Sequence, residues 1–120
     1  MALSTLHENG IIHRDVKPDN VLATIIDPDL EGPRIKLADF GFMTRFKRGE
    51  SVQEDPEPVG LKVALGTRFF MAPEIIKGEE EQTSAVDIWA VGVFAFYLLT
   101  FGQYPFPGTS KEVVNSKILH

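Results

Sequence analysis

The feature that most limits how this chain can fold is a helical segment without a polar face. Ser84 followed by Asp87 is typical of a helix N-terminus with a capping box, and the residues after it predict a helix over about 85–100. Within this helix, residues 88–99 are apolar on nearly every side rather than along one stripe. Because a helix of this kind has to be surrounded by protein, we expect other elements to pack around it.

Size and charge exclude several classes of protein. With 120 residues, the chain is long enough for one small domain, and its net charge of -5 offers no basic surface for nucleic acid or anionic lipid. The absence of cysteine excludes disulfides, thiol catalysis and cysteine-based zinc modules. The first residues lack the pattern of a signal peptide, and no apolar run reaches the roughly 20 residues that span a bilayer. We therefore expect a cytoplasmic or nuclear protein with no nucleic-acid or membrane partner.

Short elements are predicted on both sides of a turn-rich segment. Residues 1–9 have the pattern of the last turns of a helix that a glycine ends. The apolar runs 21–23 and 35–38 predict two strands joined by a long connection. Residues 42–66 are polar with mixed charge and are expected to form a loop, whereas 111–119 has helical spacing. The expected fold is mostly α-helical with a short β-hairpin.

An eight-residue motif lies directly before the first of these strands. It reads His13-Arg14-Asp15-Val16-Lys17-Pro18-Asp19-Asn20 and matches the catalytic loop of protein kinases. The family's other motifs follow in the same order, as Asp39-Phe40-Gly41, Ala72-Pro73-Glu74 and Asp87-Ile88-Trp89. Four motifs in this order, covering nearly the whole chain, make coincidence negligible. The sequence therefore resembles a protein kinase domain, and Lys17 with Gly66-Thr67 is similar to the serine/threonine-specific pattern.

The resemblance implies a division of the chain into parts. Residues 1–120 would be a partial kinase catalytic domain, with the catalytic loop at 13–20, the activation segment at 39–74 and the central helix at about 85–100. These parts belong to the C-terminal lobe of a kinase. No glycine-rich loop, strand lysine or helix glutamate precedes the catalytic loop, and the last helices of the lobe are lacking too. We expect the N-terminal lobe to lie in the same longer chain.

The resemblance also implies an ATP site with assigned roles. Asp15 would accept or orient the proton of the substrate hydroxyl, and Lys17 would steady the γ-phosphate. Asn20 and Asp39 would bind Mg²⁺ that bridges the ATP phosphates, and Leu22 would form the floor of the adenine pocket. The implied cofactors are therefore ATP and Mg²⁺.

Other residues are expected to support this site. Thr67 would bind the catalytic loop and help to seat the acceptor, although a loop hydroxyl or a phosphorylation site is the alternative. Asp87 would accept hydrogen bonds from the backbone of the catalytic loop, besides its local place at the start of the helix. His13 and Phe40 are expected to be packing residues of the family's internal spine. We do not assign acid or base chemistry to His13.

Regulation and substrate preference stay open at this point. Arg14 before Asp15 marks kinases in which a phosphate or an acidic group neutralises the arginine. Residues 52–66 contain no Ser, Thr or Tyr that could be phosphorylated. The group that neutralises Arg14 would therefore be an acidic side chain or a phosphorylated hydroxyl elsewhere in the chain. The acidic candidates are Glu50, Glu54, Asp55 and Glu57, and the hydroxyl candidates are Thr44, Ser51 and Thr67. Asp19 could bind a basic residue of the substrate. Tyr97, however, stands at the position where basophilic kinases of another group have a second acidic residue.

Two functions compete. The favoured one is part of a serine/threonine kinase that transfers the γ-phosphate of ATP to protein Ser and Thr hydroxyls, with this chain inactive on its own. The alternative is a noncatalytic binding module, a truncated kinase lobe that engages partners through its apolar surface. The long connection before Ile35, the segment 39–42 and the segment 104–108 resemble the calcium/calmodulin-dependent kinase group. That resemblance implies a protein substrate with a Ser or Thr acceptor and regulation by a calcium sensor.

Overall fold

Helices make up most of the regular structure in the computed structural model, which describes residues 2–24, 32–45, 65–79 and 82–120. In chain order, the elements are α1 (Ala2–Glu8), β1 (Ile11–Ile12), the 3₁₀ helix η1 (Pro18–Asn20), β2 (Val21–Ala23), β3 (Ile35–Leu37), β4 (Thr44–Arg45), α2 (Leu65–Arg68), α3 (Pro73–Lys77), α4 (Ala85–Leu99) and α5 (Lys111–Leu119). The expected mostly helical class with a short hairpin is confirmed. None of the helices in the described part is long and apolar enough to cross a membrane.

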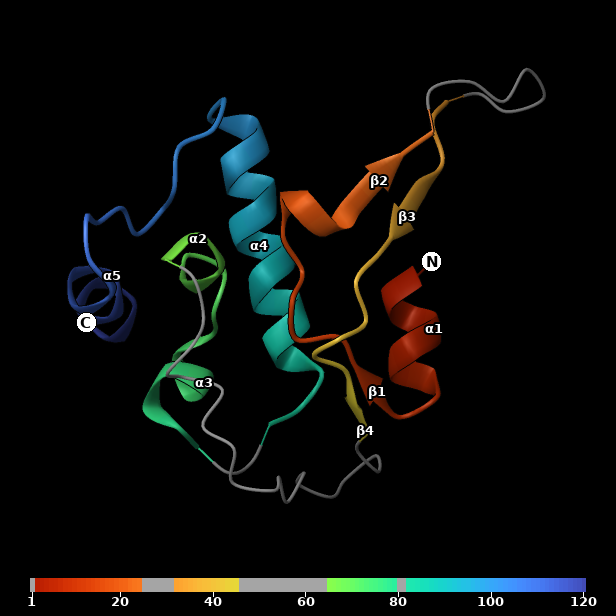
Figure 1. Cartoon of the computed structure of the whole chain (residues 1–120), viewed down its shortest axis with the longest axis horizontal. Coiled ribbons are helices and arrows are strands. Elements are labelled where there is room, and N and C mark those ends of the chain that lie inside the picture. The colour runs from red at the N-terminus through yellow and green to blue at the C-terminus, as the bar shows by residue number, and fades with distance from the viewer. Residues whose placement is uncertain (1, 25–31, 46–64, 80–81) are drawn as a thin grey trace.

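The long helix α4 runs through the middle of the molecule, as the sequence predicted. Helices α2, α3 and α5 lie on one side of it, and α1 with the four short strands lies on the other (Figure 1). The larger core cluster joins α4 to α5 and to the segment between α2 and α3. Its buried members are Val16, Phe69, Phe70, Ala90, Val93, Val114 and Ile118.

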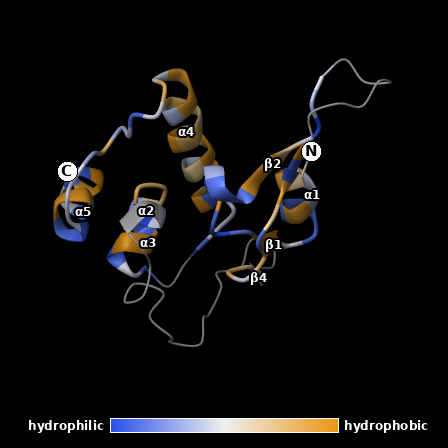
Figure 2. Ribbon diagram, turned by 45° about the horizontal axis from the view of Figure 1, so that its top comes forward, coloured by the Kyte–Doolittle hydropathy of each residue, from blue (hydrophilic) through white to orange (hydrophobic). Residues whose placement is uncertain are grey.

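Only one face of α4 is covered by the described elements. Its buried side chains are Val86, Asp87, Ala90 and Val93. Ala90 lies three or four residues from each of the other three, so these positions share one face. Figure 2 shows that much of this helix is apolar. Even so, Ile88 and Leu98 are each 60% exposed and Leu99 is 81% exposed. Within the described part of the chain, other elements therefore cover one face of this helix, and its second face lacks the neighbours that an all-round apolar helix needs.

The predicted hairpin forms, and a second strand pair accompanies it. Strands β2 and β3 are antiparallel, with Val21 opposite Leu37 and Ala23 opposite Ile35. Strands β1 and β4 also pair, although β4 falls in the segment that was expected to be a loop. Because β4 has two residues and both are polar, it shows no alternation from which a strand is predicted.

Helices α2 and α3 were not predicted either. Their sequences are four and five residues long, which is too short for a helical period to appear. Helix α3 nevertheless carries terminal signals, because Pro73 starts it and Gly78 ends it with a left-handed φ of 70°. The pair of a proline and a glycine five residues later could have identified this helix from the sequence.

The predicted capping box at the start of α4 is wrong. Ser84 has helical backbone angles and its side chain makes no capping hydrogen bond. Thr83 Oγ1 instead accepts a hydrogen bond from Ala85 N at 3.2 Å. The carboxylate of Asp87 is directed away from its own helix end, towards the segment that follows β1. Its partners there make it part of the candidate site.

Candidate functional site

The loop of residues 13–20 joins β1 to β2 and is fixed by core packing just before it begins and again near its middle. Ile12 is fully buried in the smaller core cluster, with Ala72 and Val86. Val16 belongs to the larger cluster and is 3% exposed. Three polar residues of the loop are buried along with Ile12 and Val16, namely His13, Asp15 and Asn20. Because buried polar groups need partners, their hydrogen bonds show how the site is built.

Asp87 holds the backbone of this loop in an unusual conformation. Its Oδ2 accepts a hydrogen bond from His13 N at 2.9 Å, and its Oδ1 accepts one from Arg14 N at 2.8 Å. Arg14 has a φ of 65°, in the left-handed region that residues other than glycine rarely adopt. Such a residue costs about 1–3 kcal/mol, and hydrogen bonds to a charged group return about 1.5–3 kcal/mol each. The expected contact between Asp87 and the loop backbone is therefore confirmed.

The imidazole of His13 connects this loop to the end of β3. Its Nδ1 accepts a hydrogen bond from Asp15 N at 3.2 Å, so that nitrogen carries no proton. Nε2 lies 3.2 Å from Ala38 O and is therefore the donor in that contact. The ring also meets Phe40 edge to face, with 5.5 Å between centroids. Both ring nitrogens of a neutral His13 are thus used inside the protein, in agreement with the expected packing role.

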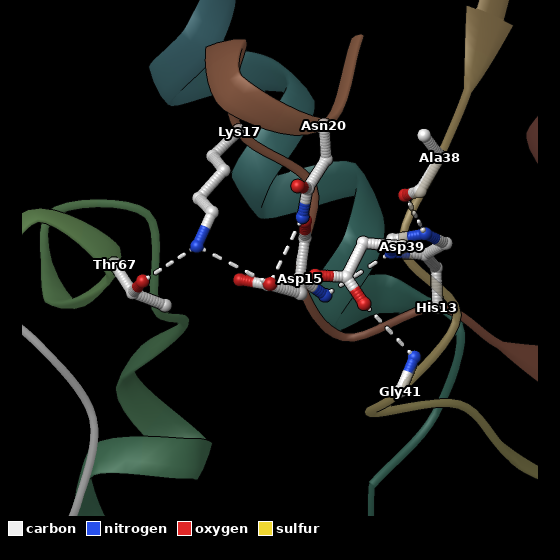
Figure 3. A network of polar contacts seen from close by, with 8 residues as sticks. All are labelled: His13, Asp15, Lys17, Asn20, Ala38, Asp39, Gly41 and Thr67. Carbon is white, nitrogen blue, oxygen red and sulfur yellow. Dashed lines mark hydrogen bonds and ion pairs between the residues drawn. The ribbon is translucent and has the colours of Figure 1, made fainter.

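Asp15 lies at the centre of a polar network (Figure 3). Asn20 Nδ2 donates to Asp15 Oδ2 at 2.9 Å and to the Asp15 carbonyl oxygen at 2.8 Å. Lys17 Nζ lies 3.3 Å from the same Oδ2. Asp15 Oδ1 is buried and has no hydrogen-bond partner among the described residues. A buried carboxylate oxygen in this state is costly for folding, and it is suited to accept a hydrogen bond from a ligand.

Lys17 links this carboxylate to a distant part of the chain. Its Nζ donates to Thr67 Oγ1 at 2.8 Å, across 50 residues, so the ammonium group sits between Asp15 and the end of α2 (Figure 3). A small cavity borders both Asp15 and Thr67, with Met71 and Ala90 in its wall. The sequence-predicted residues Asp15, Lys17, Asn20 and Thr67 are therefore in direct contact with one another or share a partner.

Asp39 lies beside this network rather than in it. Ala38 N donates to Asn20 O at 2.8 Å, which places the start of β2 next to the residue that precedes Asp39. Asp39 is exposed, has a φ of 58°, and accepts a hydrogen bond from Gly41 N through Oδ1 at 3.2 Å. A Cβ at Gly41 would come within 3.3 Å of that oxygen, so glycine keeps this turn uncrowded.

Two side-chain oxygens in this region suit a hard cation. The amide nitrogen of Asn20 faces Asp15, so its amide oxygen is turned away from that carboxylate (Figure 3). The second candidate ligand is the Asp39 carboxylate. The described residues contain no group of three or more acidic or His side chains that could hold a metal by themselves. These two oxygens therefore fit Mg²⁺, which commonly takes one or two protein ligands and completes its shell with phosphate and water.

Leu22 stands apart from these residues. It lies on β2 and is 53% exposed, so the described elements do not form a pocket above it. Its role as the floor of an adenine pocket stays a prediction.

The sequence interpretation missed His7, which lies on α1. Its Nε2 is 2.8 Å from Asp87 Oδ2. The signal was present, because His7 follows Leu3 by four residues and therefore lies on the same helix face. Arg14 has further contacts as well. Its Nε donates to Phe42 O at 2.7 Å, and burial lowers the pKa of its guanidinium while the charge of Asp87 opposes that change.

Comparison with known proteins adds independent information. The family model for the protein kinase domain matches residues 1–120. The chain is 35% identical over 118 residues to sperm motility kinase Z of Mus musculus, covering 98% of the chain and 20% of that protein. It is 37% identical over 118 residues to calcium/calmodulin-dependent protein kinase type I of Schizosaccharomyces pombe, covering 98% of the chain and 32% of that protein. It is also 39% identical over 110 residues to the liver/testis isoform of the phosphorylase b kinase gamma catalytic chain of Bos taurus, covering 88% of the chain and 23% of that protein. The chain thus spans between a fifth and a third of the length of these relatives.

Proposed function

Because this chain belongs to the protein kinase domain family, we propose that it carries the phosphoryl-transfer centre of a serine/threonine protein kinase. The reaction would move the γ-phosphate of ATP to Ser and Thr hydroxyls of a protein substrate. One observation carries the proposal: the buried Asp15 presents an unpartnered oxygen beside Lys17, Asn20 and Thr67. The family uses ATP and Mg²⁺ in general, and the polar groups of this site match what that chemistry needs.

Asp15 is proposed to orient the attacking hydroxyl. Phosphoryl transfer asks for an in-line nucleophile and for neutralisation of charge on the phosphoryl oxygens. With Oδ2 held by Asn20 and Lys17, Oδ1 is the oxygen that can accept the hydrogen of a substrate hydroxyl. Its fixed position lowers the entropy that has to be lost before the reaction.

Lys17 and Thr67 are proposed to complete the acceptor site. The Lys17 ammonium is held at 2.8 Å from Thr67 Oγ1 and would stabilise negative charge on the transferred phosphoryl group. Thr67 fixes the ammonium and borders the cavity next to Asp15, where an acceptor would sit. The alternative roles of Thr67 as a plain loop hydroxyl or a phosphorylation site predict no dependence of turnover on the Lys17 contact.

Asn20 and Asp39 are the residues proposed to hold Mg²⁺, through the amide oxygen and the carboxylate. The ion would neutralise the charge of the ATP phosphates. Leu22 is proposed to contact the adenine ring of ATP from its exposed position on β2. These assignments extend the family's general use of ATP and Mg²⁺ to particular residues of this chain.

We also propose how the parts of the chain correspond to a kinase. Residues 13–20 would be the catalytic loop, 39–74 the activation segment and 85–100 the central helix of a C-terminal lobe. The lengths of the relatives support the proposal that the remaining ATP-binding residues belong to an N-terminal lobe of a longer protein. The name of the yeast relative supports a calcium sensor as a regulator, and no such contact is needed for the assignments above.

Activity is proposed not to require phosphorylation of the 39–74 segment. Among the hydroxyl candidates, Thr44 lies in β4 and Thr67 is bound by Lys17, whereas Ser51 lies outside the described residues. The guanidinium of Arg14 is already close to the Phe42 carbonyl. We predict that phosphatase treatment of the complete gene product leaves its rate of peptide phosphorylation unchanged. A loss that maps to this segment and is restored by rephosphorylation would contradict the prediction.

The test of the proposed function is a direct assay of phosphate transfer. The complete gene product would be incubated with Mg²⁺ and γ-labelled ATP, together with peptides that carry Ser, Thr or Tyr as their only acceptor. We expect label on the Ser and Thr peptides and none on the Tyr peptides. Label on Tyr alone would overturn the serine/threonine assignment.

The noncatalytic binding module remains the second candidate, and the exposed apolar face of α4 is the observation that favours it. In the same assay, the absence of label on every peptide, with an ATP-binding lobe present in the protein, would favour this candidate over the kinase.

A further inference from the structure

A buried cation joins the segment that carries Thr67 to the helix α5. Arg68 is the last residue of α2, directly after Thr67, and is only 5% exposed. Its Nη1 donates a hydrogen bond to Asn115 Oδ1 on α5 at 3.1 Å, across 47 residues of sequence. A buried guanidinium is costly for folding unless acceptors meet its N–H groups. The acceptor on α5 therefore helps to keep Arg68 in the interior.

The position of α2 depends on its neighbours. It has four residues, and isolated helices shorter than about 12 residues are marginal in water. Helix α5 contacts both α2 and α3. In the segment after α2, Phe69 stacks on Tyr104 with 4.0 Å between ring centroids, and Phe70 shares the larger core cluster with Val114 and Ile118 of α5. The end of α2 is thus held against α5 by apolar packing and by one directional bond.

The hydrogen bond defines this position more narrowly than packing does. Attraction between apolar surfaces is non-directional, whereas the bond from Arg68 to Asn115 needs its acceptor close to the N–H direction. An apolar side chain of similar volume in place of a buried ionic group often costs no stability. Stability alone therefore does not explain a buried arginine here, but a defined position for the end of α2 does.

The connection continues from Arg68 to the reacting group. Thr67 precedes Arg68 in the chain, so a shift of Arg68 moves the Thr67 hydroxyl with it. That hydroxyl accepts a hydrogen bond from Lys17 Nζ at 2.8 Å, and the same Nζ lies 3.3 Å from Asp15 Oδ2. A displacement of about 1 Å at a reacting group is enough to lower turnover by about 100-fold.

We propose that Asn115 is a positioning residue, which holds Arg68 and thereby places the Thr67 hydroxyl that fixes the Lys17 ammonium group. As far as turnover is the readout, this inference rests on the proposed kinase function. Asn115 itself lies on α5 and acts on the acceptor site only through the end of α2.

The carboxylate of Glu112, one turn earlier on α5, also interacts with Arg68 through its charge. Hydrogen bonds from its own backbone and from Ser110 lower the pKa of Glu112, and the charge of Arg68 contributes less. Glu112 is exposed, so water and salt screen its charge. A screened charge does not set a direction, and the hydrogen bond to Asn115 does.

The test compares substitutions on α5 in the complete gene product. Asn115→Leu keeps the approximate size of the side chain and removes the acceptor, whereas Asn115→Asp keeps an oxygen acceptor in the same place. Two controls lie on the same helix. Ser116→Ala changes an exposed neighbour, and Ile118→Val removes one methylene from the larger core cluster. The four variants separate loss of the hydrogen bond from changes in helix surface and packing.

Steady-state kinetics is measured in the wild-type background and in Thr67→Val, which lacks the hydroxyl. In the wild-type background, we expect Asn115→Leu to lower kcat/KM by about 3- to 10-fold, as expected for loss of one hydrogen bond. In the Thr67→Val background, the same substitution should change kcat/KM by less than about twofold, because the contact that it supports is already absent. Asn115→Asp and both controls should stay within about twofold of the wild type.

Hydrogen exchange tests the same contact without phosphate transfer. The amides of Phe70 and Met71 donate to the carbonyl oxygens of Thr67 and Arg68 at 3.1 and 3.2 Å, so they report on the turn that carries Thr67. We expect Asn115→Leu to speed exchange at these two amides by about tenfold and to leave the amides of α4 unchanged. Global destabilisation would speed exchange in both places alike. Asn115→Asp should exchange like the wild type.

Each outcome decides for or against the positioning role. Equal losses of kcat/KM for Asn115→Leu in the two backgrounds, or equal exchange at Phe70 and Met71 in Asn115→Leu and Asn115→Asp, would overturn it. Where Asn115→Leu does not fold, Asn115→Ala takes its place with the same expected results. If the wild type transfers no phosphate, the proposed function fails, and exchange at Phe70 and Met71 still tests Asn115 by itself.

Discussion

At the scale of single residues, the site is a set of contacts between segments that are far apart in the chain. Lys17 joins Asp15 to Thr67 across 50 residues, and Asp87 joins α4 to the 13–20 loop across 74. Each contact involves a charged group that is largely removed from water, where a missing partner costs more than at the surface. Loss of one partner is therefore expected to affect the reacting group rather than only the local fold.

Thr67 offers a direct test at this scale. Thr67→Val removes the hydroxyl that Lys17 binds at 2.8 Å but keeps the shape of the side chain. We predict a fall in kcat/KM of about tenfold, the equivalent of about 1.4 kcal/mol, because the ammonium group loses its fixed position. The control is Thr67→Ser, which keeps the hydroxyl and should stay close to the wild type. Equal kcat/KM values for the two variants would show that the hydrogen bond between Lys17 and Thr67 does not contribute to turnover.

At the scale of elements, the two helix N-termini that begin with serine differ in their capping. Ser110 at the start of α5 has extended backbone angles, and its side chain accepts a hydrogen bond from Val113 N at 3.3 Å. Ser84 at the start of α4 makes no such bond. The N-terminus of α4 is instead held by Thr83 and by the contacts of Asp87 with the loop.

This difference leads to a matched pair of stability measurements. Ser110→Ala should lower the free energy of unfolding of the complete gene product by about 0.5–2 kcal/mol, as expected for loss of an N-cap. Ser84→Ala should change it by less than about 0.5 kcal/mol. Denaturant titration of both variants would check the prediction. A larger loss for Ser84→Ala than for Ser110→Ala would mean that the capping box at α4 forms after all.

The elements also show what the sequence could predict and what it could not. Helix α4, the β2–β3 hairpin and the contact of Asp87 with the loop were predicted, because a long apolar segment, short apolar runs beside turn residues and motifs in a fixed order carry strong signals. Strand β4 and helix α2 were missed, since two to four residues contain no readable period. The contact of His7 was missed because its partner lies 80 residues away, and the spacing of His7 from Leu3 indicates a shared helix face but not that partner.

At the scale of the whole molecule, one apolar face has no cover in the described part of the chain. Leu99 is 81% exposed and Phe101, just beyond the helix, is 99% exposed. Ile88 and Leu98 add two more large side chains at 60% each. An exposed side chain of this size forgoes about 1.5–3 kcal/mol of burial, and a domain has only about 5–15 kcal/mol of net stability. The burial that four such side chains forgo is comparable in size with that margin.

We predict that residues 1–120 alone are a poorly folded monomer without phosphate transfer. The remaining ligands for magnesium would act in a wet, open site where electrostatic interactions are weak. Thermal unfolding of the isolated chain should lack a cooperative transition, and calorimetry should detect no Mg-ATP binding. A monodisperse, cooperatively melting monomer that binds Mg-ATP with micromolar affinity would refute this prediction and require a different ATP site.

The central claim is that Asp15 is the carboxylate that orients the acceptor hydroxyl, and one substitution tests it most directly. Asp15→Asn in the complete gene product removes the negative charge but retains the size of the side chain. The matched control is Glu79→Gln, which removes an exposed carboxylate whose ion pair with Lys77 spans 3.6 Å at the surface. Both variants would be measured for Mg-ATP binding and for peptide phosphorylation. We predict that Asp15→Asn keeps ATP affinity within about threefold and lowers kcat by about 100- to 10,000-fold, while Glu79→Gln behaves like the wild type. Turnover of Asp15→Asn equal to that of Glu79→Gln would contradict the account.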